Sequence, residues 1–351
     1  MPVRAQGDNP IKTQQTMENP RVLFISQEIS PFMPETEVSK MSRDLPNGMH
    51  ELGIEVRLFM PRFGCVNERR NQLHEVIRLS GMNLVIDGAD HPLIIKVASM
   101  QNTRMQVYFI DNEDYFHRKE PLIDPRYKMP YLDNDERSLF FCKGVLETVK
   151  KLRWSPDVIH CHGWMSAFAP LLIKKAYADD PLLAGARVVY SIYNDDFEVP
   201  LSPHLRRKMA AMGIARKEVE LLKEPNFLNL TKLAIKHSDA VITCSRTIDS
   251  EITGFLSTQQ KLRSVIDIET KGNYIETYSQ LYNRLLIGAG RKRRFRSTPP
   301  PRKAATRPSP AKVKAMQAGI PPSNRNKNAQ PELLDPMEQN DEQSIINNPS
   351  I

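Results

Sequence analysis

"RVLFISQEISPFMPETEVSKMSRDLPNGMHELGIEVRLFM", residues 21–60, contains the first strand, helix and strand pattern of the chain. Its apolar run Val22–Ile25 is typical of a strand buried in a parallel sheet. A helical pattern follows over residues 39–52 and ends at Gly53, and alternating apolar residues predict a second strand at 55–60. Strand, helix and strand this close together form a βαβ unit, whose crossover joins parallel strands.

The same alternation of strand and helix signals continues along the chain, with one interruption. Strand-like stretches at residues 74–86, 93–99 and 105–110 have no helices between them and predict a hairpin-bearing insertion. Further strands are predicted at 157–160, 188–192 and 240–243, and helices at 135–152, 165–177, 203–223, 228–236, 248–255 and 272–287. We therefore predict one doubly wound, Rossmann-like α/β domain over residues 21–287.

Two polar segments flank this domain. Residues 1–20 are polar and lack the apolar core of a secretory signal, so we predict that they form a disordered leader. Residues 288–351 hold ten prolines and carry +7 of the chain's net charge of +8, so they predict a disordered basic tail. The cluster Arg291–Arg296 suits either an acidic partner or a solubilising role, and the partner is not identified by the sequence.

Several classes of protein are excluded by motifs that do not occur. The sequence contains no GxGxxG, GxxxxGK[ST], GxSxG or HExxH, so we predict no cofactor. No run approaches the about 18 apolar residues of a membrane helix, and a cytoplasmic location is expected. The cysteines fit no CxxC pattern and are expected to be reduced, buried thiols; they are Cys65, Cys142, Cys161 and Cys244.

Polar residues follow four of the predicted strands. The segments are SQEISPF at 26–32, HCHGW at 160–164, YNDD at 193–196 and CSR at 244–246. Ligands of open α/β sheets bind at these carboxyl ends, although loops are polar in any case. Trp164 beside two histidines favours a sugar-binding cleft, because indole faces stack on sugar rings and imidazoles bind hydroxyls.

His160 and His162 share one face of their strand, which is also the spacing of a metal pair. No third ligand is identifiable, so we predict no metal site. We interpret His160 as a structural residue at the end of the strand, and we expect His162 to project into the cleft.

Five segments resemble, in chain order, the motifs of bacterial glycogen synthases and plant starch synthases (glycosyltransferase family 5). They are residues 21–64, DNDER at 133–137, PDVIHCHGWMSAFAP at 156–170, VVYSIYN at 188–194 and HSDAVITCSRTIDSEI at 237–252. Members are two-domain GT-B enzymes that transfer glucose from ADP-glucose to an α-1,4-glucan with retention. The resemblance implies that this chain is the N-terminal, acceptor half, closed by the helix at 272–287.

The resemblance also implies functional residues. His162 and Asp133 would be catalytic residues beside the transferred glucose. Trp164, Asn194 and Asn134 would bind substrate. The implied partners are α-1,4-glucan (glycogen) and a nucleotide sugar, together with a separate protein that supplies the second, nucleotide-binding domain.

Departures from the family pattern concentrate on the phosphate-binding side. The family's Lys-Thr-Gly-Gly-Leu loop aligns with Pro34-Glu35-Thr36-Glu37-Val38. Carboxylates thus stand where a diphosphate would bind, and they would repel it. Gly163 replaces an aspartate and Tyr193 a histidine. Two hypotheses follow: a glycogen/starch synthase-like glucosyltransferase, or a non-catalytic glucan-binding or regulatory protein built on the acceptor domain.

Overall fold

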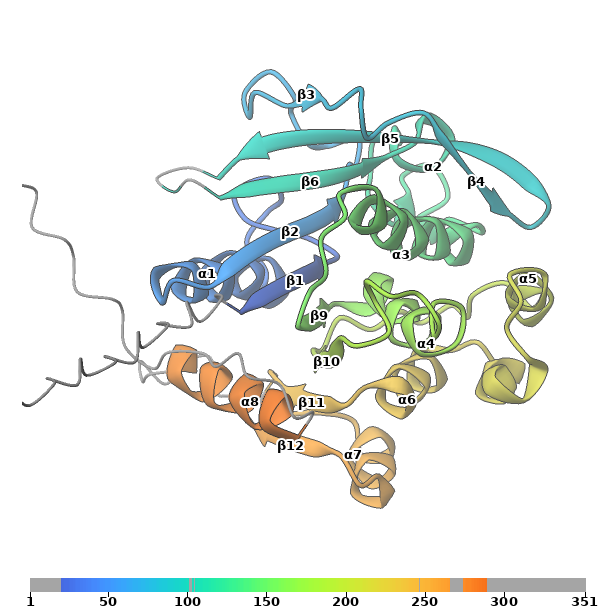
Figure 1. The fold of residues 1–351 in the computed structure, drawn as a ribbon. Helices are drawn as coiled ribbons and strands as arrows, with labels where there is room; N and C mark the ends of the chain where they lie inside the picture. The colour runs from blue at the N-terminus through green and yellow to red at the C-terminus, as the bar shows by residue number, and fades with distance from the viewer. Residues whose placement is uncertain (1–19, 101–102, 104, 246, 266–273, 289–351) are drawn as a thin grey trace, which may run out of the picture. The chain divides into compact units, whose positions relative to one another are not determined.

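The computed structural model describes residues 20–100, 103, 105–245, 247–265 and 274–288, and it is built on one large sheet (Figure 1). The strand order is β12-β11-β10-β9-β1-β2-β6-β5-β3, with β4 paired to β5. The strands of this sheet are β1 (Arg21–Ser26), β2 (Glu55–Pro61), β3 (His74–Glu75), β4 (Met82–Ile86), β5 (Ala89–Ser99), β6 (Gln106–Asp111), β9 (Val158–His162), β10 (Arg187–Ile192), β11 (Ala240–Thr243) and β12 (Leu262–Val265). β5 pairs antiparallel with β3, β4 and β6, and all other neighbouring strands of this sheet pair parallel.

The helices cover both faces of the sheet, which confirms the doubly wound α/β fold. In Figure 1, α1 (Glu37–Glu51) and α8 (Tyr274–Gly288) lie on one face. α3 (Asn134–Lys151), α4 (Phe168–Lys175) and α6 (Phe227–His237) lie on the other. The remaining helices are α2 (Glu113–Phe116), α5 (Leu205–Ala211) and α7 (Ser250–Thr258), with 3₁₀ helices η1 (Trp164–Ser166) and η2 (Arg216–Lys223). None of the described helices is both long and apolar enough to cross a membrane.

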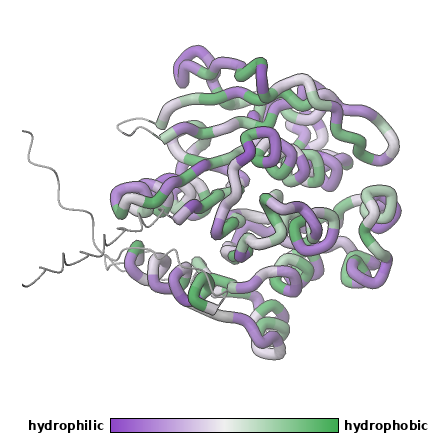
Figure 2. The backbone as a smooth tube through the Cα atoms, in the orientation of Figure 1, coloured by the Kyte–Doolittle hydropathy of each residue, from purple (hydrophilic) through white to green (hydrophobic). Residues whose placement is uncertain are grey.

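β1 lies at the centre of the core, between β2 and β9. Its residues Val22, Leu23, Phe24 and Ile25 are fully buried, as the apolar run predicts. Figure 2 shows hydrophobic and hydrophilic residues following one another along the helices, as in amphipathic segments. Because Phe24 pairs with His160 and Ser26 with His162, these four side chains share one face of the sheet, the face that α8 covers.

α1 and α8 approach each other closely at Gly48. A Cβ built on this residue would lie 2.5 Å from Cδ1 of Ile275 on α8. α1 itself begins in a capping box, in which the Thr36 hydroxyl accepts from the Ser39 N–H and the Ser39 hydroxyl accepts from the Thr36 N–H. The predicted closing helix is therefore packed against the first helix of the domain.

Some predictions needed correction. The helix expected at 203–223 is divided into α5 and η2, and the strand β12 and the small hairpin of β7 (Ile123–Asp124) and β8 (Met129–Pro130) were not predicted. Cys65 is exposed instead of buried. Apart from Pro20 and Gly288, the predicted leader and tail lie outside the described residues, and the domain boundaries stay a prediction.

Candidate functional site

The carboxyl ends of β1, β9 and β10 border a cavity of about 970 Å³. Gln27, Trp164 and Tyr193 line it from these three strand ends. The start of α1, the segment around the β7–β8 hairpin and the loop 194–204 complete the wall. The cavity thus lies where ligands of doubly wound sheets bind.

The charged side chains of this cavity are mainly acidic. Five carboxylates line it, from Glu28, Glu37, Asp195, Asp196 and Glu198. Among the described lining residues the basic side chains are Lys128 and His204. A cavity with this balance favours neutral or positively charged ligands and repels a diphosphate.

Asp195 is a half-buried carboxylate of the lining that bonds to the main chain. Its Oδ2 accepts a hydrogen bond from the N–H of Trp164 at 2.8 Å. Burial above all, together with the neighbouring carboxylates of Glu28 and Asp196, raises the pKa of Asp195 to about 7, although the hydrogen bond from the Trp164 N–H opposes this shift. This carboxyl group therefore changes its protonation state near neutral pH. In the sequence, Asp195 is one of the four residues 193–196 that follow β10, and nothing in that pattern indicates that its carboxylate would contact the main chain.

Trp164 begins η1 directly after Gly163, whose φ of 80° lies in the left-handed region. Its side chain is only 3% exposed, and its ring packs edge-on against Phe197 with centroids 4.9 Å apart. Trp164 therefore forms part of the cavity wall, but it offers little free surface for a sugar ring to stack on.

Asn134 and Asn194, the two predicted substrate-binding amides, both line the cavity. Asn134 is buried, donates to the Leu122 carbonyl at 2.9 Å and accepts from Arg137 at 2.6 Å. Asn194 is exposed, and its side-chain amide lies 3.4 Å from the Thr247 hydroxyl. Asn194 is thus the better placed of the two to meet a ligand.

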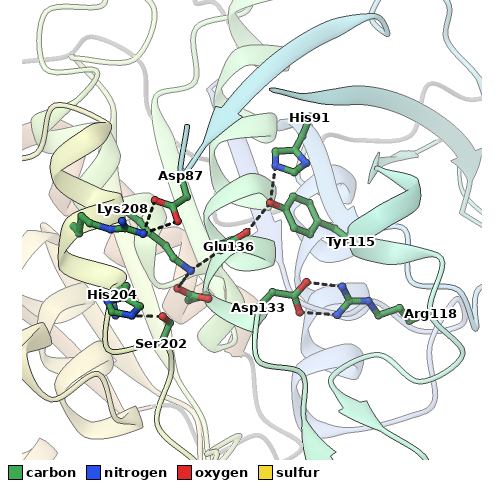
Figure 3. Close-up of polar contacts among 11 residues, drawn as sticks. Asp87, His91, Tyr115, Arg118, Asp133, Glu136, Ser202, His204 and Lys208 are labelled. Atoms are coloured by element: carbon green, nitrogen blue, oxygen red, sulfur yellow. Dashed lines mark hydrogen bonds and ion pairs between the residues drawn. The ribbon is translucent and has the colours of Figure 1, made fainter. Parts of the chain in front are cut away.

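Asp133, the first predicted catalytic residue, is paired with a cation (Figure 3). Arg118 contacts both oxygens of its carboxylate, with Nη1 2.6 Å from Oδ1. The guanidinium also lies over the ring of Tyr131, 4.5 Å from its centroid. Asp133 precedes α3 and does not belong to the cavity lining, so the structure holds it beside the cavity in an ion pair.

A second polar network crosses the first turn of α3 (Figure 3). The buried ammonium of Lys208, on α5, lies 2.7 Å from Asp135 and 2.6 Å from Glu136. Glu136 also accepts from the Tyr115 hydroxyl, which lies 3.0 Å from His91. Because α5 follows the loop 194–204, this network anchors the end of a loop that lines the cavity.

His162, the second predicted catalytic residue, does not project into the cavity as expected. Its side chain is fully buried, its Nδ1 lies 2.7 Å from the Tyr193 hydroxyl, and its ring lies 4.0 Å from that of His160. Burial lowers the pKa of His162 to about 3. The expectation failed because the side chain follows the face of β9 that Tyr193 and Phe24 cover.

His160 has both ring nitrogens at hydrogen-bonding distance from hydroxyls, Nδ1 2.6 Å from Tyr282 and Nε2 2.8 Å from Ser191. These contacts agree with a structural role, because they join β9, β10 and α8. Within the described ranges, no three His, Cys, Asp or Glu side chains gather in a way that could hold a metal ion.

The segment Pro34–Val38 forms the entry into α1. Glu37 lines the cavity and accepts from the Ser245 hydroxyl at 2.6 Å. Thr36 donates to Glu28, whose pKa is raised by burial. Glu35 instead pairs with Arg43 at 3.0 Å. Of the two carboxylates expected to oppose a diphosphate, only Glu37 lines the cavity, and Glu28, which the sequence did not single out, adds a second.

A family model described as the starch synthase catalytic domain matches residues 21–267. The chain belongs to the starch synthase catalytic domain family. Glycogen synthases of Chlorobium phaeovibrioides and Chlorobium limicola are 32% and 31% identical to it over 236 and 249 residues. These matches cover 67% and 71% of this chain but 48% and 50% of the relatives, so the chain spans about half the length of the curated relatives it matches.

Among solved structures, the catalytic domain of Starch Synthase IV from Arabidopsis thaliana bound to ADP and acarbose shares this fold. It aligns with a TM-score of 0.58 at 20% identity, over 73% of this chain and 53% of that chain. This member of the starch synthase family has an acidic entry to α1, and its buried His162 lies behind the cavity-lining Tyr193.

Proposed function

We propose that this starch synthase-type domain binds α-1,4-glucan in the cavity at the carboxyl ends of β1, β9 and β10. The observation that carries the proposal is a largely apolar cavity whose lining also presents amide groups and several carboxylates. Such groups accept and donate hydrogen bonds to sugar hydroxyls, and a neutral glucan meets no repulsion from them. Family membership supports the same class of ligand.

The acidic entry to α1 argues against tight binding of a nucleotide sugar by this domain alone. Retaining transfer depends mainly on stabilising the charge of the leaving diphosphate. Glu28 and Glu37 line the cavity at this entry, where they would repel that charge. Stabilisation of the leaving group would therefore have to come from elsewhere.

A second candidate function is transfer of glucose from ADP-glucose to the bound glucan, assisted by a separate protein that supplies a nucleotide-binding domain. The support for it is the family assignment, over residues 21–267. His162 and Asp133 stay the predicted catalytic residues, and His162 would have to become accessible from its buried position to touch a sugar. We also keep the cytoplasmic location as a prediction.

Sedimentation with glycogen tests the first proposal. We expect the full chain to co-sediment with glycogen and to be released by excess maltoheptaose. Asn194→Ala should weaken binding, because Asn194 lines the cavity and is exposed. Asn83→Ala, on the exposed side of β4, is the matched control and should bind as the unaltered protein does. No sedimentation under any condition would refute the proposal.

Label transfer separates the two candidates. The chain is incubated with glycogen and labelled ADP-glucose or UDP-glucose, and the label is counted in the precipitated polymer. Glycogen binding without incorporation supports the glucan-binding function. Incorporation that His162→Ala abolishes, with glycogen binding intact, would establish the transferase instead.

A further inference from the structure

The turn after β9 carries no side chain at residue 163, and a carboxylate reaches this turn from the neighbouring strand. A Cβ on Gly163 would lie 2.7 Å from Cβ of Gln27, and the φ of 80° disfavours other residues. Asp195 lies two residues after Tyr193, which lines the cavity. Its carboxylate accepts a hydrogen bond from the N–H of Trp164, the residue directly after this glycine. The turn therefore places the Asp195 carboxylate against the cavity wall, where a side chain from residue 163 is excluded.

We propose that Asp195, in its ionised form, is a glucan-binding residue that accepts hydrogen bonds from sugar hydroxyls in this cavity. The inference rests on the proposed glucan-binding function. A carboxylate has about four lone-pair sites, and the Trp164 N–H occupies one of them. Hydrogen bonds from hydroxyls to an ionised acceptor are about twice as strong as those between neutral groups.

The surroundings of Asp195 make this contact depend on pH. Glu28 and Asp196 oppose its ionisation, and the other charged side chains lining the cavity are Glu37, Glu198, Lys128 and His204. With the pKa of Asp195 raised to about 7, the ionised fraction grows about tenfold between pH 6 and pH 8. Since a glucan carries no titrating group, its affinity should rise with pH over this interval.

Calorimetric titration with maltoheptaose at pH 6 and pH 8 tests the inference on the full chain. The unaltered protein should bind up to about tenfold more tightly at pH 8, because only the ionised fraction binds well. Asp195→Asn should bind weakly at both pH values. Two control variants, Glu198→Gln and His204→Gln, change other charged or titratable side chains of the lining and should keep the increase with pH.

A second readout needs no variant. At pH 7, binding should release close to half a proton per site, which appears as a dependence of the binding enthalpy on the ionisation enthalpy of the buffer. A purely structural role of Asp195 would not produce this release. Proton release that persists in Asp195→Asn, or that disappears in His204→Gln, would overturn the assignment.

The failures of the two proposals are distinguishable. If the unaltered protein does not bind maltoheptaose or glycogen at either pH, both the glucan-binding function and the role of Asp195 are refuted. If it binds, but Asp195→Asn retains the same affinity and the same dependence on pH, only the role of Asp195 is refuted. A circular dichroism spectrum of Asp195→Asn at pH 8 verifies that the variant is folded.

Discussion

The hydroxyl of Tyr193 lies 2.7 Å from Nδ1 of the fully buried His162. Tyr193 lines the cavity and His162 does not, so this contact connects the cavity wall to a buried imidazole. The other ring nitrogen, Nε2, has no hydrogen-bond partner within the described part of the chain. The Tyr193 hydroxyl is therefore the polar contact on which the burial of His162 depends.

Removal of this hydroxyl should destabilise the domain. In Tyr193→Phe, a second buried nitrogen of His162 loses its partner, and an unsatisfied buried polar group costs about 1–3 kcal/mol. Urea unfolding monitored by circular dichroism measures the loss. Tyr127→Phe, at a side chain that is 74% exposed, is the control and should leave the unfolding midpoint unchanged. Equal midpoints for Tyr193→Phe and the unaltered protein would contradict the assigned contact.

Acid should destabilise the fold through His162. Its folded-state pKa of about 3 lies below the ordinary value of 6.5, so between these values the unfolded chain binds more protons at this residue. The free energy of unfolding therefore decreases as pH falls through this interval, by about 2 kcal/mol at pH 5. His162→Gln should lose less stability between pH 7.5 and pH 5 than the unaltered protein.

Asp195 acts in the opposite direction. Its folded-state pKa of about 7 lies above the ordinary value of 3.8, so over this interval the folded chain holds more protons and stability increases as pH falls. Asp195→Asn should therefore show a larger loss between pH 7.5 and pH 5. His74→Gln, on the exposed strand β3, is the control for both variants. Identical pH profiles for all the variants would show that neither group is shifted.

Gly163→Ala should be more disruptive than alanine at a glycine of similar backbone conformation. Both Gly163 (φ 80°) and Gly213 (φ 82°) are in the left-handed region, where a Cβ costs about 1–2 kcal/mol. Only at Gly163 would the Cβ also meet Gln27, at 2.7 Å, and such overpacking adds about 1–3 kcal/mol. Thermal unfolding of the two variants compares them, and equal losses would mean that Gln27 yields without strain.

Lys208→Met should release the loop that lines the cavity. The Lys208 side chain is 5% exposed and that of Asp135 is fully buried, and breaking a buried pair by removing one partner costs about 3–5 kcal/mol. We expect lower stability together with weaker glycogen binding. Lys232→Met breaks a pair in which Glu251 is 64% exposed, and it should cost about 0–1 kcal/mol. Comparable effects of the two substitutions would argue against the anchoring role.

The strands and helices of the core could be predicted because their patterns are local. The apolar run at β1 and the 3.6-residue stripes of α3 appear in consecutive residues. β12 has no such signal: its four residues mix polar and apolar types, and it is a strand because β11 pairs with it. The hairpin of β7 and β8, with two residues in each strand, is likewise defined by pairing alone.

The position of the candidate site could be predicted from the sequence, but the environment of its side chains could not. The order of strands and helices in the sequence places the polar segments at one edge of the sheet. Trp164, Asn134 and Asn194 line the cavity at that edge. Whether Asp133 is free or paired depends on Arg118, which approaches from a separate loop. The raised pKa values of Glu28 and Asp195 depend on how far folding buries their carboxyl groups, and the residues next to them in the sequence do not indicate this burial.

The α/β class, the parallel sheet, the sheet edge with the candidate site and the family could all be inferred from the amino-acid sequence, because each depends on periodicity or on ordered motifs within short segments. The burial of His162, the ion pair of Asp133 and the contact of Asp195 with the turn at Gly163 became visible in the folded chain alone. Burial, ion pairing and protonation depend on distances between groups that are far apart in the chain, and folding sets those distances.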